Sequence, residues 1–321
     1  MSEPDAGGRW RKRLLRAARL LLAGALLVWV FSRVEPGEAW AELLAAPPWI
    51  WPAVLGLFLL NSWLYAARVV VLMPTPAPVM TVFQAVLVGN FAGIALPTGG
   101  AEAAKVVTIA PHAGGADRAL AFIAATRLIE LVIWGGLVAW AAAAVLPGRL
   151  DVLVPFAWLS ALGFVVGALV LAVAFRHGGV LAQRLAWLPK RLAAFAVGAS
   201  APFAEMARAP GKLAASAGIT ALFAATNCFT AWLIFRVYGV NIPYAEVLGL
   251  IPTLDIFLSL PLAPASVGVR EVVFLNALAP YGADAGVALA VGYTRMSGHF
   301  SRAAIGGLLF ALGRRPGGTD A

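Results

Sequence analysis

Charged residues are scarce in this sequence of 321 residues. Asp, Glu, Lys and Arg together make up 12% of it, whereas hydrophobic residues make up 61%. A soluble globular domain carries about 25% charged residues, so the composition excludes that class. Several apolar runs reach the roughly 20 residues that a helix needs to cross a bilayer. The sequence therefore predicts an all-α polytopic membrane protein, with residues 1–321 forming a single integral-membrane domain.

Residues that usually carry catalysis or bind metals are also few. Cys228 is the single cysteine, so a disulfide within one chain is excluded, and it lies in an apolar stretch. No pair of His or Cys has zinc-like spacing, and Gly99-Gly100 lacks the Gly-Lys-Ser/Thr of a phosphate-binding loop. No serine has an evident His or Asp partner. We therefore expect the protein not to be an enzyme and to bind neither a metal nor a cofactor.

The net charge of +9 comes from basic residues that gather near the ends of apolar runs. Basic residues dominate the N-terminus, the loop of about residues 176–212 and the tail, whereas residues 32–49 carry three Glu and one Arg. This is the positive-inside pattern of membrane proteins rather than a nucleic-acid-binding surface. We expect no nucleic-acid partner, and we expect both termini and the basic loop to be cytoplasmic.

The apolar runs predict about six transmembrane helices and two shorter, interrupted segments. The spans lie near residues 14–31, 50–72, 119–146, 153–175, 213–238 and 285–312. The limbs of the interrupted segments, near residues 82–113 and 244–280, are too short for a full crossing. We expect both segments to be re-entrant helical hairpins, which are tolerated where they are buried in protein or face a cavity. We expect the two hairpins to open from opposite sides of the membrane. This predicts an inverted repeat of about residues 50–146 and 213–312, as in many secondary transporters.

Each predicted hairpin contains a charged motif that proline interrupts. Residues 96–105 read LPTGGAEAAK, and residues 260–271 read LPLAPASVGVRE. A charge at the centre of a bilayer costs about 2.5–3.5 kcal/mol on insertion scales. Charges at both hairpins and on the helices after them therefore predict a polar central cavity. Buried salt bridges that only fix helix packing are the alternative.

The candidate binding residues suit an anionic headgroup. Backbone N–H groups at a helix start after residue 97 would meet an anion, and Lys and Arg would add charge-assisted contacts. The acidic residues would balance these cations or bind a coupling proton. His299 lies on a basic stripe with Arg295 and Arg302, where packing is a commoner role than proton relay. The predicted substrate-binding residues are Pro97, Gly99, Gly100, Glu102, Lys105, Arg127, Glu130, Asp255, Pro261, Gly268, Arg270, Glu271, Arg295 and His299.

These motifs resemble the bacterial lysylphosphatidylglycerol synthase transmembrane, or flippase-like, family. Glu102 and Lys105 stand where that family has an acid and then a base, usually Asp and Arg, and Thr98 stands where it has Gly. Its second motif is similar to Pro261 with residues 268–271, GVRE, and the segment of residues 63–68 resembles its early helix. The resemblance covers about residues 15–313. It implies a lipid-translocating module of the bacterial inner membrane, without the family's cytosolic aminoacyl-transferase domain.

The leading hypothesis is a flippase or transporter that moves an anionic or aminoacylated lipid headgroup through the charged cavity. Membrane lipids would be its partners, while proton coupling and a homodimer stay open. Two alternatives also stay open: a carrier of small anions, and an accessory protein that scaffolds a cell-envelope enzyme.

Overall fold

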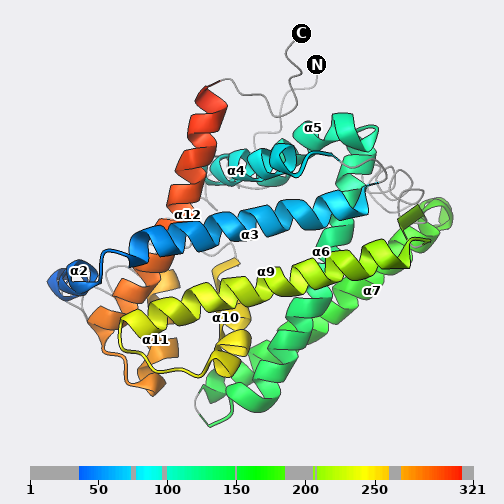
Figure 1. Cartoon of the computed structure of the whole chain (residues 1–321). Coiled ribbons are helices and arrows are strands. Elements are labelled where there is room, and N and C mark those ends of the chain that lie inside the picture. The colour runs from blue at the N-terminus through cyan, green and yellow to red at the C-terminus, as the bar shows by residue number, and fades with distance from the viewer. Residues whose placement is uncertain are drawn as a thin grey trace, which may run out of the picture.

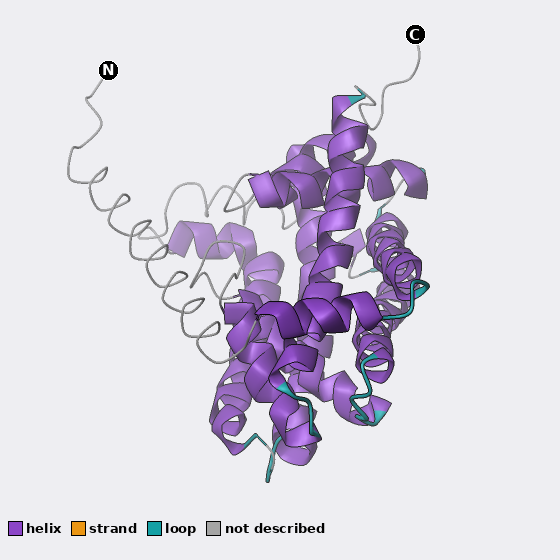
Figure 2. Ribbon diagram, turned by 90° about the vertical axis from the view of Figure 1, so that its left-hand side faces the viewer, coloured by secondary structure: helices purple, strands orange, loops and turns teal. Residues whose placement is uncertain are grey.

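The computed structural model describes residues 36–73, 77–95, 100–148, 150–184, 205–206, 208–259 and 269–312. Within these residues it consists of helices joined by loops, with no strand (Figure 2). The predicted all-α class is therefore confirmed. The predicted first span, residues 14–31, lies outside the described residues, as does most of the basic loop.

Ten α-helices and three short helical segments make up the described chain. The helices are α2 (Pro36–Ala45), α3 (Ile50–Leu72), α4 (Val79–Ala95), α5 (Gly100–Ala113), α6 (Ala116–Trp140), α7 (Val154–Arg184), α9 (Pro210–Val237), α10 (Tyr244–Ser259), α11 (Val269–Leu278) and α12 (Ala285–Ala311). The short segments are η1 (Ala141–Val145), which continues α6 as a π-helix, and the 3₁₀ turns η2 (Asp151–Leu153) and η4 (Ala279–Tyr281).

Three segments of the described chain are long and apolar enough to cross a bilayer. They are Ile50–Leu72, Ala116–Val145 and Pro210–Val237. Two shorter apolar stretches, Val79–Gly93 and Val154–Leu169, accompany them. Their length and composition agree with a multi-pass membrane protein, and the three long segments coincide with three of the predicted spans.

Helices α3 and α9 lie side by side and run in opposite directions (Figure 1). Ser216, near the start of α9, donates its hydroxyl to the carbonyl of Arg68, near the end of α3, over 3.1 Å. About two turns further along α9, Phe223 packs edge-on against Tyr65 with the ring centroids 6.5 Å apart. Around this pair, α12 contacts α2, α3, α4 and α11, while α6 contacts α5, α7, α9 and α10.

Two apolar cores lie at opposite ends of α3. One contains Ile50, Val54 and Phe58 from its first half, packed against α6, α9, α10, α11 and α12. The other contains Val69 and Leu72 from its last turns, packed against α4, α5 and the start of α6. The polar residues of the candidate site lie around the middle and the far end of this helix.

A tight turn brings α5 back against α6. Gly114 and Gly115 have φ angles of 81° and 127°, which residues with a Cβ atom rarely adopt. Because this turn is so short, the first turns of α5 face the middle of α6, where the candidate site begins.

Glycines let α12 approach its neighbours closely. A Cβ atom built on Gly306 would lie 2.0 Å from the carbonyl oxygen of Leu87 in α4, and one built on Gly298 would lie 2.3 Å from the Phe58 ring in α3. Small residues at such crossings are how membrane helices gain van der Waals contact. The seam between α12 and α4 is therefore a contact of backbone with backbone.

We expect Gly306→Ala to destabilise the protein by about 1–3 kcal/mol, because the added methyl group meets backbone that cannot move aside. The matched control is Gly218→Ala in α9, where an added Cβ has nothing within 4 Å. That change should be neutral or slightly stabilising because alanine favours a helix. Thermal unfolding in detergent measures both, and equal melting temperatures for the two variants would contradict the close seam.

Candidate functional site

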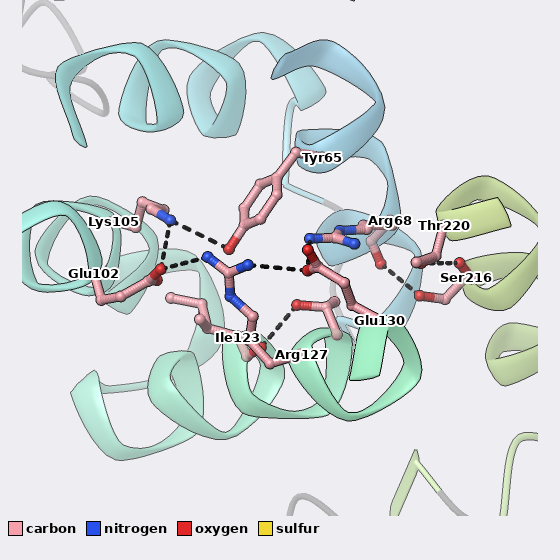
Figure 3. Close-up of polar contacts among 10 residues, drawn as sticks. Tyr65, Arg68, Glu102, Lys105, Ile123, Arg127, Glu130, Ser216 and Thr220 are labelled. Carbon is pink, nitrogen blue, oxygen red and sulfur yellow. Dashed lines mark hydrogen bonds and ion pairs between the residues drawn. The ribbon is translucent and has the colours of Figure 1, made fainter. Parts of the chain in front are cut away.

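A continuous chain of ion pairs joins α3, α6 and α5 (Figure 3). The Arg68 guanidinium donates to the Glu130 carboxylate over 2.6 Å, and Arg127 donates to the same oxygen over 3.0 Å. Arg127 also donates to Glu102 over 2.7 Å, and Lys105 donates to Glu102 over 2.9 Å. We refer to these five residues as the ion-pair chain. Three cations thus share two carboxylates.

The ring of Tyr65 lies close to all three cations of the ion-pair chain (Figure 3). Its ring centroid lies 4.3 Å from the Arg68 guanidinium carbon, 4.5 Å from Lys105 Nζ and 5.4 Å from the Arg127 guanidinium carbon. The Lys105 ammonium also donates to the Tyr65 hydroxyl over 3.3 Å. A ring face next to cations contributes about 0.5–2 kcal/mol for each in a desolvated setting. Tyr65 therefore offsets part of the cost of burying a surplus of positive charge.

Helix geometry explains why the chain forms where it does. Glu102 and Lys105 are spaced i,i+3 on α5, and Arg127 and Glu130 have the same spacing on α6. Residues at this spacing share a helix face, so the two pairs meet when the tight turn places α5 beside α6. Arg68 completes the chain from α3, where its side chain is fully buried.

A second polar cluster joins α9, α10 and α12. Arg295 binds Asp255 with two hydrogen bonds, of 2.7 Å and 2.8 Å, one to each carboxylate oxygen. Asn227 donates to Asp255 over 3.2 Å and accepts from Arg295 over 3.4 Å. We refer to these three residues as the Asp255 cluster. Such a two-pronged pair is the strongest geometry available to a guanidinium and a carboxylate, and Arg295 is only 4% exposed.

A cavity of about 320 Å³ lies between the ion-pair chain and the Asp255 cluster. We refer to it as the central cavity. Six of the described helices contribute residues to its wall, namely α3, α6, α9, α10, α11 and α12. Its lining residues are Phe58, Asn61, Glu130, Trp134, Phe223, Asn227, Asp255, Arg270, Phe274, Arg295, His299 and Arg302.

A second cavity, of about 360 Å³, adjoins the first, and we refer to it as the lateral cavity. Glu130, Trp134 and Asp255 line both cavities, and the lateral cavity continues along Arg127 to Phe164 of α7. Beyond it, α7 exposes large apolar side chains, which are Trp158, Leu159, Leu162, Val165, Val166 and Leu169. Phe164 therefore brings the lateral cavity to a helix whose exposed side chains at residues 158–169 are apolar.

Two arginines of the central cavity have no salt-bridge partner among the described residues. Arg302 donates to His299 Nδ1 over 2.9 Å and lies 5.2 Å from the Phe58 ring, but it meets no carboxylate in this part of the chain. Arg270 lines the cavity and likewise forms no ion pair with any described carboxylate. Both side chains are only partly exposed, and a charge that is partly removed from water is costly unless it is paired, so these two guanidiniums are the groups that a bound anion would satisfy.

The structure brings together most, but not all, of the predicted binding residues. Glu130, Asp255, Arg270, Arg295 and His299 line the central cavity, and Arg127 lines the lateral one. Glu102 and Lys105 line neither cavity and connect to them only through the ion-pair chain. Glu271 is buried in α11, and Gly100 is the first residue of α5. Pro97, Gly99, Pro261 and Gly268 lie outside the described residues.

Several lining residues were not in the predicted set. Arg302 carries the same signal as the predicted ones, a charge within an apolar helix, and so does Arg68 of the ion-pair chain. Asn61, Asn227 and Trp134 carry no such signal, because amide and indole groups are common in membrane helices without a binding role. Only their contacts identify them.

The fold and the site define the class of the protein, which is an all-helical, multi-pass membrane protein with charged residues buried between its helices. Residues 16–295 match the family described as the lysylphosphatidylglycerol synthase TM region, and the chain belongs to this family. The resemblance seen in the sequence motifs is therefore confirmed, and it relates the protein to lipid handling. No curated protein and no solved structure matches the chain.

Proposed function

We propose that this protein translocates a polar lipid headgroup across the membrane through the central cavity. The observation that carries the proposal is the set of charged side chains that line that cavity, which includes two arginines without a carboxylate partner among the described residues. The headgroup would enter the cavity, and the acyl tails would stay in the bilayer. Lipids are favoured over soluble ligands because the chain belongs to a family named for a lipid synthase.

The lateral cavity supports a lipid substrate in particular. It runs from Glu130 and Asp255 to Phe164 on α7, and the large exposed side chains of residues 158–169 on this helix are apolar. A lipid needs such a route, because its tails must remain in contact with the bilayer while its headgroup is bound. A small anion carrier is the second candidate, since about 320 Å³ is also the size of a small-molecule site.

The helix contacts support the proposed inverted repeat. If α3, α4, α5 and α6 are exchanged for α9, α10, α11 and α12 respectively, each helix contact within or between the two units has a counterpart. α4 contacts α12 as α10 contacts α6, and α5 contacts α6 as α11 contacts α12. The pair α4–α5 and the pair α10–α11 would be the two re-entrant hairpins, and movement of one unit against the other would give alternating access.

The remaining parts of the proposal concern topology and chemistry. We propose about six spans, cytoplasmic termini and location in a bacterial inner membrane, on the strength of the loop charges. We further propose that these 321 residues transfer no aminoacyl group and act on the lipid only by moving it.

Reconstitution into liposomes tests the proposal directly. Headgroup-labelled lipids in the inner leaflet should become accessible to a membrane-impermeant quencher much faster with the protein than without it. Uptake of radiolabelled inorganic phosphate, measured in parallel, distinguishes a small-anion carrier. The matched control is the Asp255→Leu/Arg295→Leu variant, which we expect to fold but to lack the Asp255 cluster. If folded wild-type protein moves no lipid of any charge, the proposed function is wrong.

A further inference from the structure

The charge balance of the central cavity indicates which class of headgroup it takes. Given the proposed function, we infer that the substrate carries net negative charge, and that the cavity discriminates against a lysylated, cationic headgroup. The phosphate of the substrate binds Arg270, Arg302 and the Nε atom of Arg295. This preference follows from which charged groups in the wall of the cavity are already paired.

Among the described residues, the two carboxylates that line the cavity are already engaged. Glu130 accepts from Arg68 and from Arg127 at the same oxygen. Asp255 accepts from Arg295 at both of its oxygens. An ammonium group entering the cavity would therefore have to compete with a guanidinium that is already bound to each of its acceptors.

The unpaired groups of the wall are nearly all hydrogen-bond donors. Nε of Arg295, Nε of Arg302 and the indole N–H of Trp134 are buried with no hydrogen-bond partner among the described residues. Asn61 Oδ1 is the one acceptor of the described cavity wall in the same condition, and its amide also carries two donors. The phosphodiester of a lipid headgroup offers only acceptors at neutral pH and so complements this set.

The whole described polar interior carries an excess of positive charge. Six cations face four carboxylates: Arg68, Lys105, Arg127, Arg270, Arg295 and Arg302 against Glu102, Glu130, Asp255 and Glu271. The hairpin tips do not change this balance, because residues 96–99 and 260–268 contain no charged side chain. One phosphodiester would reduce the excess, whereas a lysyl headgroup with its two amines would increase it.

Guanidinium chemistry strengthens the preference. Arginine binds phosphate through a planar fork of N–H donors, and charge-assisted bonds of this kind are about twice as strong as neutral ones. Arginine also keeps its charge in a poorly hydrated site, which lysine often does not. All three cations of the central cavity wall within the described residues are arginines.

The test compares three lipids with the same acyl chains in the reconstituted system: phosphatidylglycerol, phosphatidylcholine and lysylphosphatidylglycerol. The anionic lipid should move about tenfold faster than the lysylated one, which corresponds to about 1.4 kcal/mol. Equal or faster movement of the lysylated lipid overturns the inference and leaves the proposed function intact.

If no lipid moves, the proposed function fails, and binding decides the inference separately. Short-chain versions of the anionic and lysylated lipids are then added to the protein in detergent, because a ligand that binds the folded state raises the melting temperature. A larger rise with the anionic lipid supports the inference. An equal or smaller rise overturns it.

Substitutions locate the selectivity in the two unpaired arginines. Arg270→Gln/Arg302→Gln should bring the ratio of anionic to lysylated transport close to one. The matched control is Arg236→Gln, which removes an exposed arginine at the end of α9 whose partner is Asn241, and it should leave the ratio unchanged. If the double variant does not fold, Arg270→Gln alone should lower the ratio. An unaltered ratio in a folded variant assigns the preference to other residues and overturns the inference.

Discussion

Glu130→Gln should destabilise the protein by about 3–5 kcal/mol, because it removes the carboxylate from a buried ion pair and leaves the cation in place. Two guanidiniums depend on this carboxylate. Arg68 is fully buried, and its Nε and Nη1 atoms already have no partner among the described residues. Arg127 would keep only Glu102. The glutamine amide is nearly isosteric, so the loss reports charge rather than packing.

A surface pair of the same protein provides the control. Arg118 and Glu205 lie 2.6 Å apart, but their side chains are 42% and 51% exposed. Exposed pairs contribute about 0–1 kcal/mol, so Glu205→Gln should change the melting temperature little. Denaturation of both variants in the same detergent measures the difference. If Glu130→Gln costs no more than Glu205→Gln, the ion-pair chain does not stabilise the fold.

Asp255→Leu should be comparably harmful, and a second substitution should reverse the damage to stability but not to transport. Alone, Asp255→Leu leaves Arg295 buried, 4% exposed, with only the Asn227 carbonyl as a weak partner. Loss of one member of a buried pair costs about 3–5 kcal/mol, whereas replacing both by apolar residues is often neutral. The Asp255→Leu/Arg295→Leu variant should therefore recover most of the stability.

Transport should not recover with it. Arg295 and Asp255 both line the central cavity, and two leucines offer nothing to a headgroup. We expect the double variant to unfold near the wild-type temperature and to move lipid no faster than protein-free liposomes. Wild-type transport by this variant would show that the Asp255 cluster only holds α9, α10 and α12 together.

The sequence predicts the parts of this site that are local along the chain. The pairs Glu102–Lys105 and Arg127–Glu130 follow from helical spacing alone, and the structure confirms both contacts. The link between Asp255 and Arg295 spans 40 positions and joins two helices. No local pattern reports such a contact, because helix packing decides which faces meet.

The same distinction applies to the fold. Apolar runs predict α3 and α9 closely, since length and composition alone decide whether a helix can span a bilayer. The end of α7 differs, because the helix continues to Arg184 through residues assigned to the basic loop. Arginine is a good helix former, so a change from apolar to basic residues marks a membrane boundary without ending the helix. The sequence does not predict the role of Tyr65, because that role depends on three cations that lie on three different helices, α3, α5 and α6.

For the proposed transporter, the glycine contacts of α12 have a consequence for how selectivity can change during evolution. Arg302 lies between Gly298, which rests on the Phe58 ring, and Gly306, which rests on the backbone of Leu87. The helix is therefore held against α3 one turn before Arg302 and against α4 one turn after it. A relative with another substrate cannot easily reposition this cation by shifting the helix. It would have to exchange the side chain itself. Relatives with different headgroup preferences should therefore differ at position 302 while the packing of α12 stays the same.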